Sequence, residues 1–196
     1  MSREDWEKNP IHMVLQRANL WPFRNSDIRT VLDVACGLSL KSRFLNCPIV
    51  VGVDIHEPYL RAIDYQKPHV VIKHDVRFLG DIMIEDSFDV VYAIDILEHV
   101  TKKESEKLIE DCKRIAKKAV IIETPNGYVP QNIDIQGFNA DKYQTHRCHW
   151  EVDQLRQRGF KCVVRQYKMQ DIKRHTKIQV CPDIELIDGI FIKEKV

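Results

Sequence analysis

Acidic residues stand at regular spacing at or near the ends of apolar segments in the first half of the chain. Asp54 closes the run I-V-V-G-V-D, and Asp33 lies 21 positions earlier, inside T-V-L-D-V. This separation is one strand–helix–strand unit. In α/β nucleotide sites, a carboxylate at the end of the second strand accepts hydrogen bonds from both ribose hydroxyls, because it offers two acceptor oxygens. The spacing therefore predicts a nucleoside site with Asp54 as the ribose ligand.

Three small residues follow the segment T-V-L-D-V. Ala35, Cys36 and Gly37 come directly after Val34. Small residues at this point let the backbone approach a ligand closely. A carboxylate within an apolar strand is costly without partners, so we expect Asp33 to accept hydrogen bonds from the turn amides or from a cationic ligand. The alternative interpretation is a buried strand and loop that bind no ligand.

The elements that position these residues follow from the hydrophobic pattern. The segment 30–39 is expected to form the first strand and the tight turn after it. Further apolar runs predict strands over residues 49–55, 70–75, 88–95 and 119–124. Helices are expected over 11–21, 40–46, 57–66, 105–116 and 150–159, and the runs 161–169 and 184–193 are expected to close the sheet as an antiparallel pair. This order predicts an α/β fold: a doubly wound, mostly parallel seven-stranded sheet with helices on both faces.

Two motifs carry a family resemblance. The segment T-V-L-D-V-A-C-G-L-S, residues 30–39, resembles the first motif of class I S-adenosylmethionine-dependent methyltransferases, V-L-D-x-G-C-G-x-G, with Ala35 and Ser39 in place of the first and last glycines. The segment F-D-V-V-Y-A-I-D-I-L-E-H, residues 88–99, resembles a hallmark of the type 11 branch that includes the ubiquinone and menaquinone methyltransferases. T-P-N-G at 124–127 and G-F at 159–160 are similar to sequences of the same branch.

This resemblance implies a Rossmann-like methyltransferase fold, S-adenosylmethionine as the cofactor and S-adenosylhomocysteine as its product. By the resemblance, Asp75 bonds the adenine amine, the Val76 amide bonds the adenine ring, and Asp95 borders the methionine end. Asp75 also suits a helix N-cap, and Glu98 and His99 also suit polar residues that hold a loop at a helix start. The expected cofactor-binding residues are Asp33, Ala35, Cys36, Gly37, Asp54, Ile55, Asp75, Val76 and Asp95.

Residues 126–150 show little periodicity and follow the fifth predicted strand, where the transferred methyl group is expected to point. We therefore expect an acceptor-binding lid here. His146, and then His149, are the candidates for a general base, because imidazole titrates near neutrality. The alternative for each histidine is a local packing or capping role. His146, Cys148 and His149 are metal-ligand types, but no second ligand pair lies at useful spacing, so no metal site is predicted.

The chain as a whole is expected to form one methyltransferase domain of 196 residues. Within it, residues 1–25 are expected to form a helix over the cofactor site; the alternative is a helix that packs in the core. The 30 basic and 29 acidic side chains give a net charge of +1, which does not favour nucleic acid as a partner. No apolar run is long enough to span a membrane, and polar first residues with six scattered cysteines favour a cytoplasmic location.

The expected function is methyl transfer to a small-molecule or a sugar- or lipid-linked acceptor, with O-methylation as the expected reaction. The lid sequence Y-V-P-Q followed by Y-Q-T-H-R-C-H-W is similar to methyltransferases found with surface-polysaccharide biosynthesis enzymes, and a quinone-type acceptor is the nearest rival. A dehydrogenase is disfavoured because the first turn lacks G-x-G-x-x-G. The substitutions at Ala35 and Ser39 leave open a catalytically silent regulatory or partner subunit that binds S-adenosylmethionine.

Overall fold

The computed structural model describes residues 11–39, 47–63, 70–168 and 183–194. They form a seven-stranded sheet with the order β3-β2-β1-β4-β5-β7-β6. The first five strands are parallel, while β7 runs antiparallel to both of its neighbours, β5 and β6. The predicted mostly parallel sheet with an antiparallel closing pair is confirmed. The strands are β1 Thr30–Val34, β2 Ile49–Asp54, β3 Val70–Lys73, β4 Phe88–Ile94, β5 Ala116–Pro125, β6 Lys161–Lys168 and β7 Asp183–Ile192.

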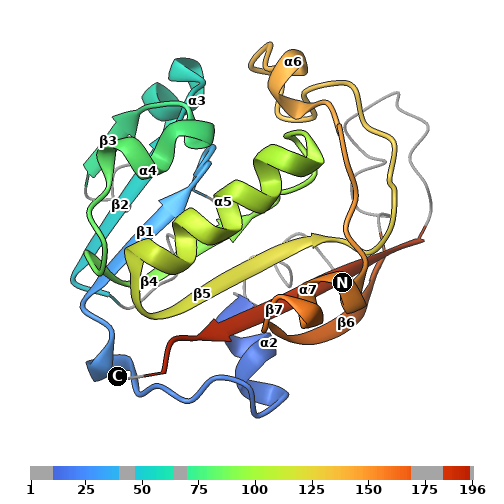
Figure 1. The fold of residues 1–196 in the computed structure, drawn as a ribbon. Coiled ribbons are helices and arrows are strands. Elements are labelled where there is room, and N and C mark those ends of the chain that lie inside the picture. The colour runs from blue at the N-terminus through green and yellow to red at the C-terminus, as the bar shows by residue number, and fades with distance from the viewer. Residues whose placement is uncertain (1–10, 40–46, 64–69, 169–182, 195–196) are drawn as a thin grey trace.

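Helices cover both faces of this sheet. On one face, side chains of α4, α5 and α7 join a core cluster with alternate residues of the central strands, such as Leu32, Val91 and Val120. On the other face, Leu15 of α2 packs with Val31 and with the other alternate residues of the same strands. Figure 1 shows α5 lying along the sheet beside β4 and β5. The helices are α2 Ile11–Arg17, α3 Glu57–Ala62, α4 Leu79–Ile82, α5 Lys102–Ile115, α6 Asp141–Gln144 and α7 Val152–Gln157.

Helix α2 ends at Arg17 and α7 spans Val152–Gln157, so both are shorter than predicted. Three other helical elements also differ from the prediction. Helix α5 begins earlier than expected because Thr101 and Glu104 form a capping box, in which each side chain accepts a hydrogen bond from the backbone N–H of the other residue. Helices α4 and α6 were not predicted, since four residues are too few to show a helical period. The helix expected over 40–46 lies outside the described residues.

The N-terminal segment lies against the core as far as it is described. Leu15 is fully buried in the cluster on the α2 face, with Leu20, Trp21 and Phe23 packed around that cluster. None of the described residues in 11–25 lines the pocket discussed below. The described part of this segment therefore contributes to the core. The helix over the cofactor site, predicted for residues 1–25, stays a prediction, and residues 1–10 lie outside the described ranges.

A search of the described residues for membrane-spanning segments identified no helix with sufficient length and apolar character.

Candidate functional site

A pocket of about 410 Å³ opens at the carboxyl ends of β1, β2 and β4. Strand β1 has β2 on one side and β4 on the other, so the chain order reverses at this point of the sheet. Open α/β sheets bind their ligands in the crevice at such a switch point. Seven of the nine predicted cofactor residues line this pocket: Ala35, Gly37, Asp54, Ile55, Asp75, Val76 and Asp95.

Asp54 is fixed at the wall of the pocket by two backbone amides. Gly37 N–H donates to Oδ2 at 2.8 Å, and His56 N–H donates to Oδ1 at 2.7 Å. Burial raises the pKa of this carboxyl above its usual value, and the backbone hydrogen bonds offset only part of that effect. Because a carboxylate offers about four acceptor positions, Asp54 can accept further donors from the pocket.

The turn after β1 bends through left-handed backbone conformations. Ala35, Gly37 and Ser39 have φ angles of 55°, 51° and 55°. Two of these residues, Ala35 and Ser39, are those that replace glycines of the family motif, so the turn keeps a conformation that favours glycine. Apart from its two chain neighbours, no described residue has an atom within 4 Å of a Cβ placed on Gly37. The pocket therefore has free space directly beside the Gly37 backbone.

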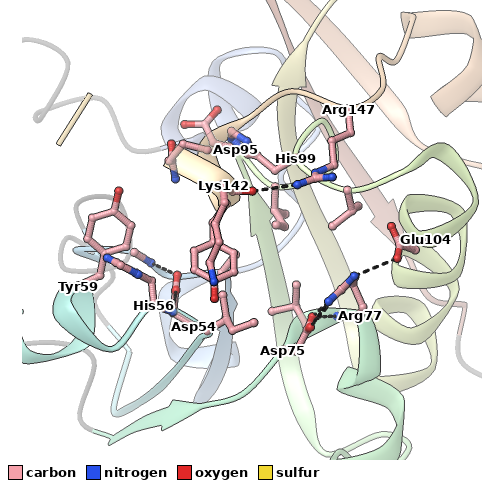
Figure 2. Close-up of a pocket in the computed structure, with 18 of the residues that line it drawn as sticks. Asp54, His56, Tyr59, Asp75, Arg77, Asp95, His99, Glu104, Lys142 and Arg147 are labelled. Carbon is pink, nitrogen blue, oxygen red and sulfur yellow. Dashed lines mark hydrogen bonds and ion pairs between the residues drawn. The ribbon is translucent and has the colours of Figure 1, made fainter. Parts of the chain in front are cut away.

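Asp75 both caps a 3₁₀ turn and lines the pocket. Its Oδ1 accepts the Arg77 backbone N–H at 3.0 Å, which caps the 3₁₀ turn Val76–Phe78, and the Arg77 guanidinium bonds both of its oxygens. Burial favours a higher pKa for this carboxyl, but the Arg77 hydrogen bonds and charge outweigh it and hold the pKa below its usual value. Arg77 also reaches Glu104 on α5 at 3.3 Å (Figure 2). The N-cap alternative for Asp75 is thus present in the structure.

The predicted lid is docked on the start of α3. Tyr59 donates its hydroxyl to Asp134 Oδ1 at 2.5 Å, and His56 Nε2 lies 2.8 Å from the Phe138 carbonyl oxygen. The Asp134 carboxylate also accepts three lid backbone N–H groups, at residues 136, 138 and 140. Figure 1 shows α6 at the same end of the sheet as α3. The lid contributes four residues to the pocket wall: Lys142, Tyr143, Gln144 and Arg147.

A buried polar cluster adjoins the pocket near Asp95. It contains Glu98 and His99 from the connection between β4 and α5, together with His146 from the lid, and one ligand atom of each lies within 4.8 Å of the others. Burial and the charge of Asp95 raise the pKa of Glu98 to about 7, against an opposing effect of His146. Burial also lowers the pKa of both histidines. Of these three residues, His99 lines the pocket.

The remaining predicted residues lie outside the pocket wall. Asp33 in β1 and Cys36 in the turn after it are both buried, and the Cys36 backbone N–H donates to the Val53 carbonyl oxygen at 3.0 Å. Burial is the main cause that raises the pKa of the Cys36 thiol. His146 belongs to the buried cluster, whereas His149 is exposed and its ring contacts Tyr128. Cys148 donates its thiol to the Leu97 carbonyl oxygen at 3.1 Å.

Sequence reasoning missed several residues that line the pocket. His56 and Tyr59 follow the second strand-end carboxylate, a position where the turn after a strand commonly meets a ligand, so their position was a usable signal. Arg77 and Glu104 reach the pocket from elements with ordinary solvent-facing patterns, and no local pattern marks them. Outside the predicted lid, the missed lining residues are His56, Tyr59, Arg77, Ile96, Val100, Thr101 and Glu104.

Comparisons with known proteins agree with this architecture. Residues 32–122 match a family model described as a methyltransferase domain. A search of curated proteins found no match. Among solved structures, a SAM-dependent methyltransferase from Archaeoglobus fulgidus is 18% identical, with a TM-score of 0.59 and 97% of each chain covered.

Two further structures show the same similarity. Magnesium protoporphyrin IX methyltransferase from Synechocystis, solved with bound SAM, is 14% identical with a TM-score of 0.56, covering 92% of this chain and 79% of that one. An S-adenosylmethionine-dependent methyltransferase from Mesorhizobium loti is 16% identical with a TM-score of 0.58, covering 94% of this chain and 99% of that one. At these identities the similarity establishes the fold.

The predicted class is therefore confirmed, with S-adenosylmethionine as the cofactor of that class, while the ubiquinone and menaquinone branch stays a prediction. The chain contains a methyltransferase domain at residues 32–122 and has the fold of the class I S-adenosylmethionine-dependent methyltransferases.

Proposed function

We propose that the chain binds S-adenosylmethionine in this pocket and methylates a hydroxyl group of a small-molecule or a sugar- or lipid-linked acceptor. The observation that carries the proposal is the Asp54 carboxylate, which is 7% exposed, held by the Gly37 and His56 amides, and placed at the switch point of the sheet. Its free acceptor positions suit the paired hydroxyls of a ribose.

The rest of the turn and the neighbouring strand end suit the nucleoside half of the cofactor. The open space at Gly37 leaves room for a ligand against the backbone. We assign the adenine contacts to Asp75 and Val76, with Ile55 beside the ribose, since all three line the pocket. Asp33 and Cys36 do not line it, and we assign them to support of the turn.

The opposite end of the pocket suits the methionine half. Figure 2 shows Asp95 and Arg147 away from Asp54 and Asp75, and the Arg147 guanidinium there donates to the Lys142 backbone carbonyl oxygen at 2.9 Å. The Asp95 carboxylate and the Arg147 guanidinium match the ammonium and the carboxylate of an amino acid. When bound, the cofactor supplies a methyl group on a sulfonium that is already activated as a leaving group. The chain's own task is then largely to position the acceptor in line with that methyl group.

A hydroxyl acceptor must also lose its proton, and the polar cluster beside Asp95 is the group that we assign to this step. His146, the base predicted from the sequence, belongs to the cluster and reaches the pocket wall through His99. His149 is exposed and outside the cluster, so we give it no part in the reaction. The lid residues Tyr143 and Gln144 line the pocket, and we assign them to the acceptor.

The test is release of S-adenosylhomocysteine from purified chain, S-adenosylmethionine and panels of sugar, lipid-linked and quinol acceptors. We expect turnover with one hydroxyl-bearing class and product methylated on oxygen. Asp54→Asn is expected to lose turnover, while Asp153→Asn, whose side chain is 77% exposed, serves as the matched control. Tight cofactor binding without turnover on any panel would instead support the catalytically silent alternative.

A further inference from the structure

The cluster that adjoins the pocket has the composition of a metal centre. Glu98 and His99 are neighbours in the chain, and His146 reaches them from the lid, 47 positions after His99. One ligand atom from each lies within 4.8 Å of the other two. Two imidazoles and one carboxylate form a donor set that binds first-row divalent ions such as Zn²⁺.

Burial sets this cluster apart from a surface group of polar residues. Glu98 is 3% exposed and His99 is 8% exposed, and His146 is half-buried. Nδ1 of His99 is buried and has no hydrogen-bond partner among the described residues. An unpaired buried nitrogen is costly unless something binds it. The His99 ring therefore keeps one nitrogen available to a cation, while the Gln144 and Thr145 backbone also lies against this ring.

Two of the three side chains are oriented by second partners. The Thr124 hydroxyl donates to Glu98 Oε2 at 2.9 Å, and His146 Nδ1 lies 2.5 Å from the Val129 carbonyl oxygen. A carbonyl only accepts, so Nδ1 of His146 carries the proton and its Nε2 keeps a lone pair. A ligating histidine whose other nitrogen donates to a backbone carbonyl is the usual arrangement at metal sites.

Hydrogen bonds of the lid backbone hold His146 close to Glu98 and His99. Backbone N–H groups of Arg147 and Cys148 donate to the Glu98 carbonyl oxygen at 2.7 and 3.3 Å. The His99 and His146 rings lie edge to face with centroids 4.7 Å apart. The three side chains are thus brought together by the docked lid rather than by one local turn.

We propose that Glu98, His99 and His146 bind one divalent transition-metal ion, with Zn²⁺ as the best match to the donor set. The inference rests on the proposed function for its role: because His99 lines the pocket, the ion would lie at the acceptor side, beside Asp95. A bound ion takes the His146 lone pair, so the cluster then promotes proton loss through the charge of the ion and not through His146 as a base. That divalent charge favours loss of the proton from an acceptor hydroxyl to solvent. The oxygen then forms its bond to the methyl carbon, and the electron pair of the broken S–C bond passes to sulfur.

The proposal is tested on purified, untagged chain, stripped of metal with a chelator and titrated with Co²⁺ and Zn²⁺ alone. We expect one equivalent of Co²⁺ to give visible absorption bands that Zn²⁺ displaces. We expect at least tenfold weaker binding for His146→Ala and Glu98→Gln. His149→Ala is the matched control, since it removes a histidine of the same lid outside the cluster and should bind like the wild type.

Folding is followed by circular dichroism for every variant, and His146→Gln replaces His146→Ala if the smaller side chain unfolds the lid. Absence of binding by well-folded wild-type chain would overturn the proposal. Equal affinity for the wild type and both cluster variants would overturn it too, because the ion would then bind elsewhere. Calorimetry with S-adenosylmethionine on the same samples separates the two claims: cofactor binding without ion binding rejects the metal site alone.

Discussion

The Asp54 carboxylate at the end of β2 accepts the backbone N–H of Gly37, in the turn after β1, at 2.8 Å. This bond joins the predicted ribose ligand to the turn that leaves space for a ligand. Asp54 is thus fixed in direction before any ligand binds, and an oriented acceptor loses less conformational freedom on binding. The β1 turn and the β2 end therefore act as one unit of the site.

Replacing Ala35 by glycine is expected to stabilise the chain. Ala35 adopts a φ of 55°, and this conformation costs a residue with a Cβ roughly 1–2 kcal/mol, part of which the extra freedom of glycine in the unfolded chain offsets. We expect the free energy of unfolding to rise by up to about 1 kcal/mol, measured by urea denaturation. Ala119→Gly, in the buried part of β5, is the control and should lower it. Destabilisation by Ala35→Gly would contradict this account of the turn.

Tyr59→Phe is expected to loosen the lid. The variant removes the 2.5 Å hydrogen bond from the Tyr59 hydroxyl to Asp134, which organises three lid amides. A hydrogen bond to a charged group contributes about 1.5–3 kcal/mol, so amide hydrogen exchange over 136–140 should become at least about tenfold faster. Tyr128→Phe, on the exposed part of the same lid, should leave it unchanged. Identical exchange in both variants would show that this bond does not hold the lid.

Arg165→Met should be among the most destabilising single changes in the sheet. The Arg165 guanidinium on β6 bonds Glu123 on β5 and lies 2.5 Å from Asp188 on β7, and both carboxylates are almost fully buried. Removing the cation leaves two buried acids and should cost about 3–5 kcal/mol. Chemical denaturation measures this loss in the free energy of unfolding. The control is Arg156→Met, which breaks an exposed ion pair and should cost less than about 1 kcal/mol. A similar small effect for both would refute the role of this buried ion pair.

Asp89 is expected to make stability depend on pH in the acid range. Although burial favours a higher value, hydrogen bonds from the Arg29 and Thr30 amides and from Lys118 lower the pKa of this carboxyl. A carboxyl with a lowered pKa stabilises the fold above its unfolded value of about 3.9, and this contribution is lost as pH falls further. Asp89→Asn should therefore cost about 1.5–3 kcal/mol at pH 7.

The comparison of Asp89→Asn with the wild type is made by urea denaturation at pH 7 and again near pH 3. The difference in the free energy of unfolding should shrink at the lower pH, because the wild-type carboxyl is then increasingly protonated. A difference that stays constant with pH would mean that the charge of Asp89 plays no part.

Much of the sheet and of the pocket to which we assign the cofactor was predictable because the signals are local. Strands buried on both faces appear as continuous apolar runs, and Asp54, Asp75 and Asp95 mark the ends of three of them. Parallel strands place their carboxyl ends at one edge of the sheet. Acidic residues at those ends are therefore predicted to lie together without knowledge of contacts between distant parts of the sequence. The start of α5 was also readable, since T-x-x-E at Thr101 and Glu104 is a capping-box signature that the prediction did not use.

The lid and the polar cluster were not predictable in the same way. Tyr59 and Asp134 are 75 positions apart, and His56 and Phe138 are 82 apart, with no periodic pattern linking them. Likewise, the T-H-R-C-H-W run suggested His146, Cys148 and His149 as a group, but the structure separates them and pairs His146 with Glu98 and His99. Such contacts depend on how an irregular segment packs, which residue type and spacing do not encode.

Calorimetric titration of the purified chain with S-adenosylmethionine tests the central claim most directly. The wild type and Asp153→Asn are expected to bind one equivalent with equal affinity. Asp54→Asn, checked for folding by circular dichroism, is expected to bind at least about tenfold more weakly, since it loses a charged acceptor for the ribose hydroxyls. Equal affinity for the wild type and a well-folded Asp54→Asn, or absence of binding by the wild type, would contradict the assignment of this pocket to the cofactor.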